Sequence, residues 1–317
     1  MKKMIRFLAV LLLAAALPFV CGAESADAAR VGGLKGPTGM ALAHIMTNND
    51  GTYAFTLEGD PMTVRDMMIA GQLDIATVPI NVGAVLYNKT QGGVRALSLI
   101  TRGMLYVLEN GDGVHSVSDL AGRTITMAGQ GATPEYVTEY ILNANGVNAE
   151  INFLGEHTDV TSQAAENLVD LVILPEPQVT NLLMKNPSFR VALDITEEFA
   201  AAARLNGNED AQLSMSVVVA RTEFVEAHPE LVEKFMDDLR ASIAFATENV
   251  AEAAQEIAAQ GIIPSAAVAE KALPSCTLVF VSGEEMEVQA TALYQILFDA
   301  NPKAVGGQVP DAEFYLK

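Results

Sequence analysis

Two glycine-rich turns hold the residues of this sequence that are best suited to binding chemistry. Each turn lies between a short apolar run and a run with helical character. A strand that turns directly into a helix leaves backbone N–H groups without partners, and the helix dipole adds partial positive charge there. Such ends bind small polar or anionic groups. The candidate ligand-binding residues are Gly36, Pro37, Thr38 and Gly39 in the first turn and Gly129, Gln130, Gly131, Ala132 and Thr133 in the second.

Each turn also has an interpretation that needs no ligand. Thr38 could cap the following helix with its hydroxyl, so the first turn could be no more than a turn and a cap. The second turn is less easily explained in this way, because two glycines and a glutamine exceed what a cap needs. Pro134 follows it and suits a first helical position.

Three further candidates come from the ends of predicted strands. Pro79 closes an apolar run and Asn81 follows it. The Asn81 amide could hydrogen-bond a ligand or cap its own helix. Glu176 lies between two prolines that fix an extended path. Its carboxylate could bind a cationic or N–H-bearing group of the ligand, or form an ion pair at the rim or hinge.

Basic residues are scarce around both turns. Only Lys35 adjoins either of them, and no arginine is placed for the bidentate grip expected on a tightly bound phosphate or carboxylate. Backbone amides and hydroxyls hold sulfonate or nitrate, yet they serve a neutral heterocycle equally well, so the charge of the ligand stays open. The net charge of −20 repels nucleic acid at long range, and we expect no nucleic-acid partner.

The sequence lacks the residue patterns of common enzymes. It has no helical histidine pair, no cysteine cluster and no glycine-flanked serine elbow, and its histidines are dispersed. Neither turn has the Gly-x-Gly-x-x-Gly spacing of a dinucleotide site. We therefore expect no catalytic residues, no metal site and no cofactor. Cys276 lies in an apolar run and is expected to be a buried, inert thiol.

The first 28 residues have the composition of an export signal. Lys2, Lys3 and Arg6 precede an uninterrupted apolar stretch over 7–20, and a small-x-small site ends at Ala28. The stretch is shorter than the roughly 20 residues that span a bilayer. The pattern predicts a signal peptide over 1–28 and a protein that works in the periplasm or on the outer face of the cell membrane. Cys21 leaves a lipid anchor open, although the residues before it fit such a signal poorly.

Short apolar runs alternate with helical patterns along the rest of the chain. This alternation predicts an α/β fold with largely parallel sheets, followed from residue 229 by an almost wholly helical tail. Helices are expected over 38–47, 61–70, 81–89, 134–145, 177–185, 229–249, 265–273 and 284–300. Strands are expected over 30–34, 52–57, 75–79, 96–108, 124–128, 151–154, 168–174, 190–194 and 213–220.

The two long strand candidates, 96–108 and 213–220, are the places where the chain could pass between two lobes and return. This predicts a first lobe built from 29–104 and 215–317 and a second lobe built from 105–214. Each lobe then contributes one glycine-rich turn to the cleft between them. Clefts between domains are preferred ligand sites, and hinge closure about the crossings is the expected motion.

Five motifs in this order resemble a known family. They are LKGPTGM (34–40), DIATVPIN (74–81), SDLAGRTI (118–125), GQGATPEY (129–136) and VDLVILPEP (169–177). The chain is similar to substrate-binding proteins of ABC importers, in the branch that includes nitrate, sulfonate, taurine and thiamine-precursor binders. The resemblance implies a type II periplasmic-binding fold, with two α/β lobes joined by two crossing strands. It also implies capture of a small solute by a monomer and its delivery to a membrane permease with its ATPase.

Two other function classes stay open on the same fold. A secreted enzyme would need turnover and clustered titratable groups in the cleft. A sensory or adhesive module would use the fold for protein contact. The motifs fit the fold and the binding role, and they do not identify the ligand.

Overall fold

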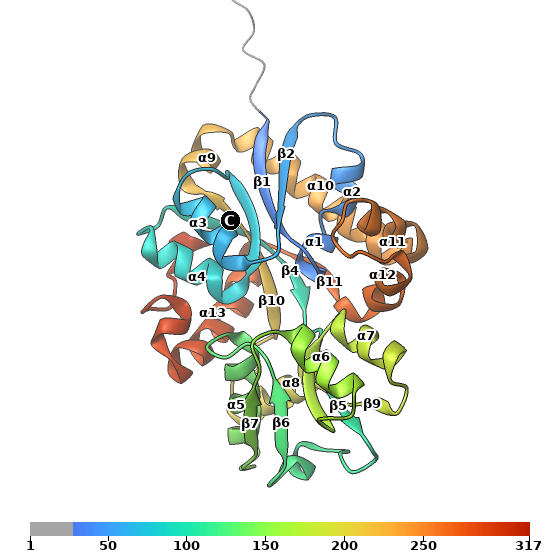
Figure 1. The fold of residues 1–317 in the computed structure, drawn as a ribbon. Helices are drawn as coiled ribbons and strands as arrows, with labels where there is room; N and C mark the ends of the chain where they lie inside the picture. Colours follow the sequence, from blue (N-terminus) through green and yellow to red (C-terminus); the bar gives the residue numbers. More distant parts are fainter. Residues whose placement is uncertain (1–27) are drawn as a thin grey trace, which may run out of the picture.

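The computed structural model describes residues 28–317 and arranges their strands in two sheets, one above the other in Figure 1. The first sheet has the strand order β11-β4-β10-β3-β1-β2. Its strands are β1 (Ala29–Leu34), β2 (Tyr53–Glu58), β3 (Ile75–Pro79), β4 (Val94–Arg102), β10 (Ser214–Arg221) and β11 (Leu278–Val281). The second sheet has the order β7-β6-β8-β5-β9. Its strands are β5 (Leu105–Asn110), β6 (Thr124–Met127), β7 (Glu150–Phe153), β8 (Leu171–Pro175) and β9 (Phe189–Asp194).

Both sheets are mixed, so the α/β class is confirmed but the prediction of largely parallel sheets is wrong. β1 runs parallel to β2 and β3, and β6 runs parallel to β7 and β8. β10 is antiparallel to β3 and β4, and β5 is antiparallel to β8 and β9. β5 is the first strand after the chain passes to the second sheet, and β10 is the first strand after it returns to the first. Each of these strands starts at the edge of its sheet that faces the other sheet. It therefore runs opposite to the strands that end at that edge.

Helices cover both sheets (Figure 1). Those in the segments around the first sheet are α1 (Pro37–Met40), α2 (Ala43–Thr47), α3 (Pro61–Ile69), α4 (Ile80–Lys89), α9 (Thr222–Ala227), α10 (Pro229–Glu248), α11 (Val250–Ala259), α12 (Ala266–Ala272) and α13 (Gly283–Ala300). Those around the second are α5 (Thr133–Ala144), α6 (His157–Ala165), α7 (Gln178–Lys185) and α8 (Ile195–Leu205). Short 3₁₀ helices are η1 (Val117–Leu120), η2 (Leu273–Cys276), η3 (Pro302–Val305) and η4 (Ala312–Phe314).

Side-chain caps fix where several helices begin. The Asp60 carboxylate accepts the Met62 N–H at the start of α3, and the Asp194 carboxylate accepts the Thr196 N–H at the start of α8. The predicted helix over 38–47 is divided into α1 and α2, and the tail contains β11 besides its helices. α6, α8 and α9 were not among the helices expected from the sequence, and α11 was covered only by the general expectation of a helical tail.

The strand candidate 96–108 forms two strands, which belong to different sheets. Gly103 and Met104 separate β4 from β5, and both have φ of 63°. This left-handed conformation cannot continue a pleated strand. The candidate 213–220 corresponds to β10, which lies wholly in the first sheet, so the second passage runs through the segment between α8 and β10. The connections between the sheets are therefore short segments next to these strands.

Apolar packing continues from one sheet to the other. One buried cluster includes Val78 and Val217 of the first sheet together with Val107 and Ile173 of the second. Cys276 is buried, as expected, and burial raises the pKa of its thiol far above the ordinary value.

The predicted signal peptide, apart from its last residue, and Cys21 lie outside the described residues. Across the range 28–317, no helix combines the length and the apolar character that crossing a bilayer requires.

Candidate functional site

The register of the strands places the candidate segments at the boundary between the two sheets. In the first sheet, Pro79 at the end of β3 pairs with Ser216 near the start of β10, and β10 begins at the passage. β1 runs parallel to β3, so its end, and the first turn after it, lie at the same edge. In parallel sheets this carboxyl edge is where ligands bind.

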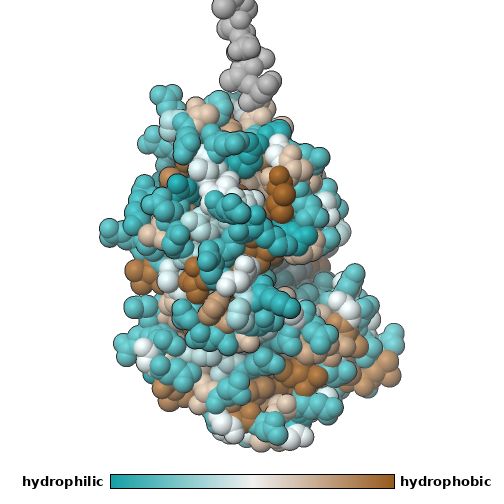
Figure 2. Space-filling view, turned by 90° about the vertical axis from the view of Figure 1, so that its left-hand side faces the viewer, coloured by the Kyte–Doolittle hydropathy of each residue, from teal (hydrophilic) through white to brown (hydrophobic). Residues whose placement is uncertain are grey.

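The second sheet presents the matching edge. Pro175 at the end of β8 pairs with Leu105, the first residue after the other passage. β6 runs parallel to β8, so the second turn, which follows β6, lies at that edge too. The structure therefore brings both turns, Asn81 and Glu176 to the region where the sheets meet. Figure 2 shows a notch in the surface at this boundary, on a face that is mostly hydrophilic.

The first turn is held by contacts within the protein. Gly36 has φ of 94° and donates its N–H to the carbonyl of Ile262 at 3.1 Å. Pro37 is the first residue of α1. Gly39 is required by packing, because an added Cβ would lie 2.2 Å from the carbonyl oxygen of Leu34.

Thr38 does not cap the helix. Its hydroxyl lies 3.0 Å from that of Ser216, which in turn accepts a hydrogen bond from the Thr101 hydroxyl at 2.8 Å. These three buried hydroxyls tie the first turn to β10 and β4. Capping is therefore not the role of Thr38, and its hydroxyl is already bonded.

Asn81 lies in the first turn of α4, and Pro79 is the N-cap residue of that helix. No side chain caps α4, and the Asn81 amide forms no hydrogen bond with any residue in 28–317. Asn81 therefore does not cap its own helix. Its half-buried amide keeps its full hydrogen-bonding capacity.

The second turn ends in an uncapped helix. α5 begins at Thr133 after the N-cap residue Ala132, and no side chain caps it. The Thr133 hydroxyl is buried, in a residue only 3% exposed, and has no hydrogen-bond partner among the described residues. Gly131 donates its N–H to the Glu135 carboxylate, while Gln130 is exposed. An unbonded buried hydroxyl costs free energy unless something supplies its partner.

Glu176 is buried, at 4% exposure, and its carboxylate is bonded within its own turn. One oxygen accepts the Thr180 N–H and the other accepts the Thr180 hydroxyl, both at 3.1 Å. Burial raises the pKa of this carboxyl, and the bonds from Thr180 only partly oppose the rise. No basic side chain in 28–317 forms an ion pair with Glu176, so the expected rim or hinge salt bridge is not formed.

Hydroxyls inside strands were missed at the sequence level. Thr77 in β3 and Ser214 in β10 are buried, and their hydroxyls have no partner in the described part of the chain. Both residues lie in mostly apolar runs, which are typical of a buried core. Their hydroxyls, at positions where a valine would fit, are the one feature that could have indicated them. Within 28–317, no group of three or more His, Cys, Asp or Glu side chains is arranged to hold a metal ion.

Comparisons with known proteins support this architecture. An ABC transporter protein from Parabacteroides distasonis is 23% identical, with a TM-score of 0.79 over 92% of this chain and 99% of that one. The periplasmic aliphatic sulphonate binding protein SsuA from Escherichia coli is 16% identical, with a TM-score of 0.70 over 90% and 95%. The alkanesulfonate-binding SsuA from Xanthomonas axonopodis, bound to MOPS, is 13% identical, with a TM-score of 0.63 over 90% and 95%.

These likenesses confirm the expected periplasmic-binding fold. Among curated proteins none matches the chain. The family model described as NMT1/THI5 like matches residues 54–253, which is more than half of the sequence. The resemblance that the five motifs suggested is therefore confirmed, and the chain belongs to the NMT1/THI5-like family.

Proposed function

We propose that this chain is the extracytoplasmic solute-binding protein of an ABC importer. A first lobe of 29–104 and 215–317 and a second lobe of 105–214 close on one small solute at their shared boundary. The closed monomer then delivers the solute to a membrane permease that works with its ATPase. The names of the solved neighbours, which include an ABC transporter protein and two sulfonate-binding SsuA proteins, support this role.

The uncapped start of α5 is the observation on which this proposal rests. At the start of α5, Pro134 has no N–H, and the Glu135 N–H donates to the Ala132 carbonyl at 3.1 Å. This leaves the Thr133 N–H without a partner in 28–317, and no side chain caps it. The buried Thr133 hydroxyl also has no partner there. A solute that accepts from the Thr133 N–H and bonds this hydroxyl satisfies both. The free Asn81 amide lies at the corresponding edge of the first sheet.

Charges near the second turn favour an uncharged solute. The Glu135 carboxylate already accepts from Gly131 in this turn. Its charge would repel sulfonate or nitrate. No arginine lies in either turn to offset it. Of the three solute classes that the sequence left open, a nitrogen heterocycle with acceptor atoms and N–H groups fits this arrangement best.

A thermal-shift screen of residues 29–317 tests the proposal. The panel comprises pyrimidines and other nitrogen heterocycles, aliphatic sulfonates, taurine and nitrate. A solute at 100 times its Kd stabilises the folded state by about 2.7 kcal/mol. We expect a heterocycle to raise Tm and the anions to leave it unchanged. Mass spectrometry of the denatured protein detects a solute already bound from the expression host.

Two matched variants locate the site. Gly131→Trp places a bulky side chain in the second turn, and Gly146→Trp places one after the opposite end of α5. Both glycines have positive φ, of 74° and 64°, and neither has a neighbour within 4 Å of an added Cβ. We expect similar losses of stability, of about 1–2 kcal/mol, but loss of solute capture only in Gly131→Trp. Equal solute affinity in the two variants would remove the second turn from the site.

A further inference from the structure

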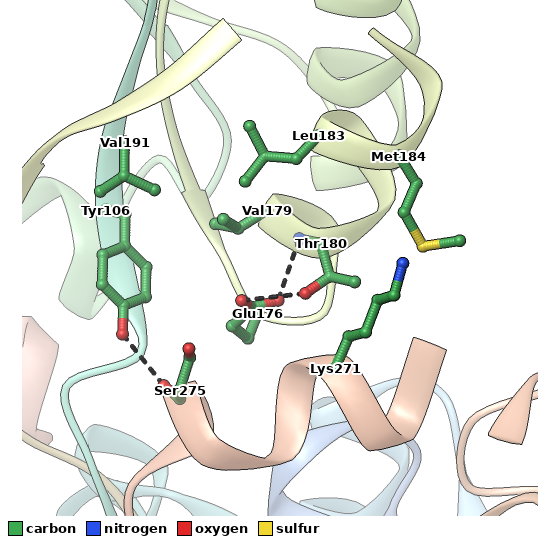
Figure 3. Close-up of a pocket in the computed structure, with 9 residues that line it drawn as sticks. All are labelled: Tyr106, Glu176, Val179, Thr180, Leu183, Met184, Val191, Lys271 and Ser275. Atoms are coloured by element: carbon green, nitrogen blue, oxygen red, sulfur yellow. Dashed lines mark hydrogen bonds between the residues drawn. The ribbon is translucent and has the colours of Figure 1, made fainter. Parts of the chain in front are cut away.

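A cavity between α7 and α12 lies outside the two turns. Its volume is about 390 Å³, within the range of roughly 300–1,000 Å³ that is usual for small-molecule sites. The residues that line it are Tyr106, Glu176, Val179, Thr180, Leu183, Met184, Val191, Lys271 and Ser275 (Figure 3). Of the ligand-binding residues predicted from the sequence, it shares only Glu176.

Both parts of the molecule supply the walls of this cavity. α7, β5 and β9 belong to the second sheet and its helices, whereas Lys271 and Ser275 come from α12 and η2 beside the first sheet. The Tyr106 hydroxyl donates to the carbonyl of Ser275 at 3.1 Å and so joins the two sides. A ligand in the cavity therefore contacts both lobes at once.

One wall of the cavity is apolar, and part of it is exposed to solvent. Val179 and Leu183 of α7 and Val191 of β9 face the Tyr106 ring in Figure 3. Met184 at the rim is 49% exposed and Val191 is 41% exposed. Burying such side chains contributes about 25 cal/mol for each Å² of apolar surface removed from water. This wall fits an aliphatic or aromatic body.

The opposite rim carries an unpaired cation. The Lys271 side chain extends from α12 toward Met184 in Figure 3. No carboxylate of residues 28–317 lies within 4.0 Å of its ammonium, although the chain has 39 acidic residues against 19 basic ones. The Glu176 carboxylate at the inner end is bonded to Thr180 rather than to Lys271. The ammonium is thus available to an anionic group from outside the chain.

We propose that the cavity between α7 and α12 is a second binding site, for an organic monoanion whose apolar body lies on Val179, Leu183 and Val191 and whose charge meets Lys271. This goes beyond the proposed function, because no residue of the two turns lines the cavity. Since both lobes line it, occupancy favours the arrangement of the lobes that this structure has. The ligand would act on solute capture through that arrangement.

Calorimetric titration of residues 29–317 with three probes of equal chain length tests this site. Sodium octanoate carries the anion, octylammonium chloride carries a cation, and 1-octanol carries no charge. We expect octanoate to bind with a Kd at least tenfold lower than that of octylammonium and below that of octanol. No detectable binding of octanoate at 5 mM, or equal binding of octanoate and octylammonium, would overturn the proposal.

Matched variants then locate the octanoate. Lys271→Glu should weaken its binding at least tenfold, whereas Lys185→Glu, at the end of α7 and outside the lining, should change it less than twofold. Met184→Glu should weaken it similarly, and Leu205→Glu, an exposed apolar residue at the end of α8, should not. Equal effects within either pair would contradict the assignment. Gly131→Trp should leave octanoate binding intact, because Gly131 does not line the cavity. The proposal of this site and the proposal of the solute site can therefore be overturned independently.

Discussion

The backbone N–H of Gly103 donates to the carbonyl oxygen of Leu213 at 2.8 Å. This bond joins the two segments through which the chain passes between the sheets. Next to it, the carbonyl of Met104 accepts the N–H of Glu176, at 2.9 Å. The turn between β8 and α7 is therefore fixed to the same point about which the proposed lobes would move. A rearrangement of the lobes must keep these bonds or exchange them for others.

Gly103→Ala is expected to destabilise the protein by about 3 kcal/mol. About 1–2 kcal/mol is the cost of a left-handed φ in an L-residue. The rest arises because the new Cβ would lie 2.0 Å from the Thr196 hydroxyl oxygen. Urea unfolding followed by circular dichroism measures the change. Gly207→Ala is the control, since Gly207 also has positive φ but its added Cβ meets nothing within 4 Å.

The overlap with Thr196 can be separated from the strain. In a Thr196→Ala background the hydroxyl is gone and only the Cβ remains, at 3.1 Å from the added carbon. The cost of Gly103→Ala should then approach that of Gly207→Ala, which gives a coupling free energy in a double-mutant cycle. An unchanged cost in this background would show that the contact with Thr196 is not responsible.

Much of the fold could be predicted from periodicity, because apolar runs of strand length alternate with amphipathic helices. β3 has the bounds expected from the sequence, and most other strands differ by a residue or two. The break at Gly103 and Met104 could not be predicted, because both neighbouring runs are apolar and nothing marks a left-handed Met. Strand direction was also out of reach, since it depends on which edge of a sheet the returning chain enters.

The positions of the turns in the candidate site could be predicted from the sequence, but the hydrogen bonds of their side chains could not. The glycines and prolines mark where strands become helices, and the strand order then brings those ends together. Whether a hydroxyl is free depends on long-range partners. Thr38 is bonded by Ser216, 178 residues away, whereas Thr133 has no partner within 28–317. Spacing in the sequence contains no information on that difference.

Glu109, in β5 of the second sheet, should make the stability of the protein depend on pH in the acid range. Burial opposes ionisation of this carboxyl, but the N–H groups of Val114 and Gly113 and the guanidinium groups of Arg190 and Arg123 outweigh it and hold its pKa below the ordinary value. A depressed pKa adds stability above the unfolded pKa of about 4.3, and this stability is lost as pH falls through the folded pKa.

Glu109→Gln should therefore destabilise the protein by about 3 kcal/mol at pH 7, because it leaves the Arg190 charge without its partner. The difference from the natural chain should shrink as pH falls below about 4.3. Urea unfolding at a series of pH values between 7 and 3.5 measures it. A difference that stays constant with pH would show that the charge of Glu109 is not what stabilises this region.

Glu176 should have the opposite pH dependence. Burial raises the pKa of its carboxyl, so the folded state favours the protonated form. The stability from this group is complete below the unfolded pKa of about 4.3 and is lost as pH rises through the folded pKa. Glu176→Gln imitates the protonated form and keeps an acceptor for the Thr180 N–H. It should equal the natural chain in unfolding free energy near pH 3.5 and exceed it at pH 7. A variant that is less stable at pH 7 would contradict this account.

Thr133→Val should separate solute binding from stability. Valine has nearly the same shape and removes a buried hydroxyl that has no partner among the described residues, so the free protein should be about 1 kcal/mol more stable. Solute affinity should fall about tenfold, the equivalent of about 1.4 kcal/mol, because the solute loses that hydrogen bond. Thr138→Val is the matched control on the same helix, since the Thr138 hydroxyl donates to the carbonyl of Pro134 at 2.8 Å. That variant should lose stability and keep its affinity. The reverse pattern, measured by urea unfolding and calorimetry, would place the solute away from α5.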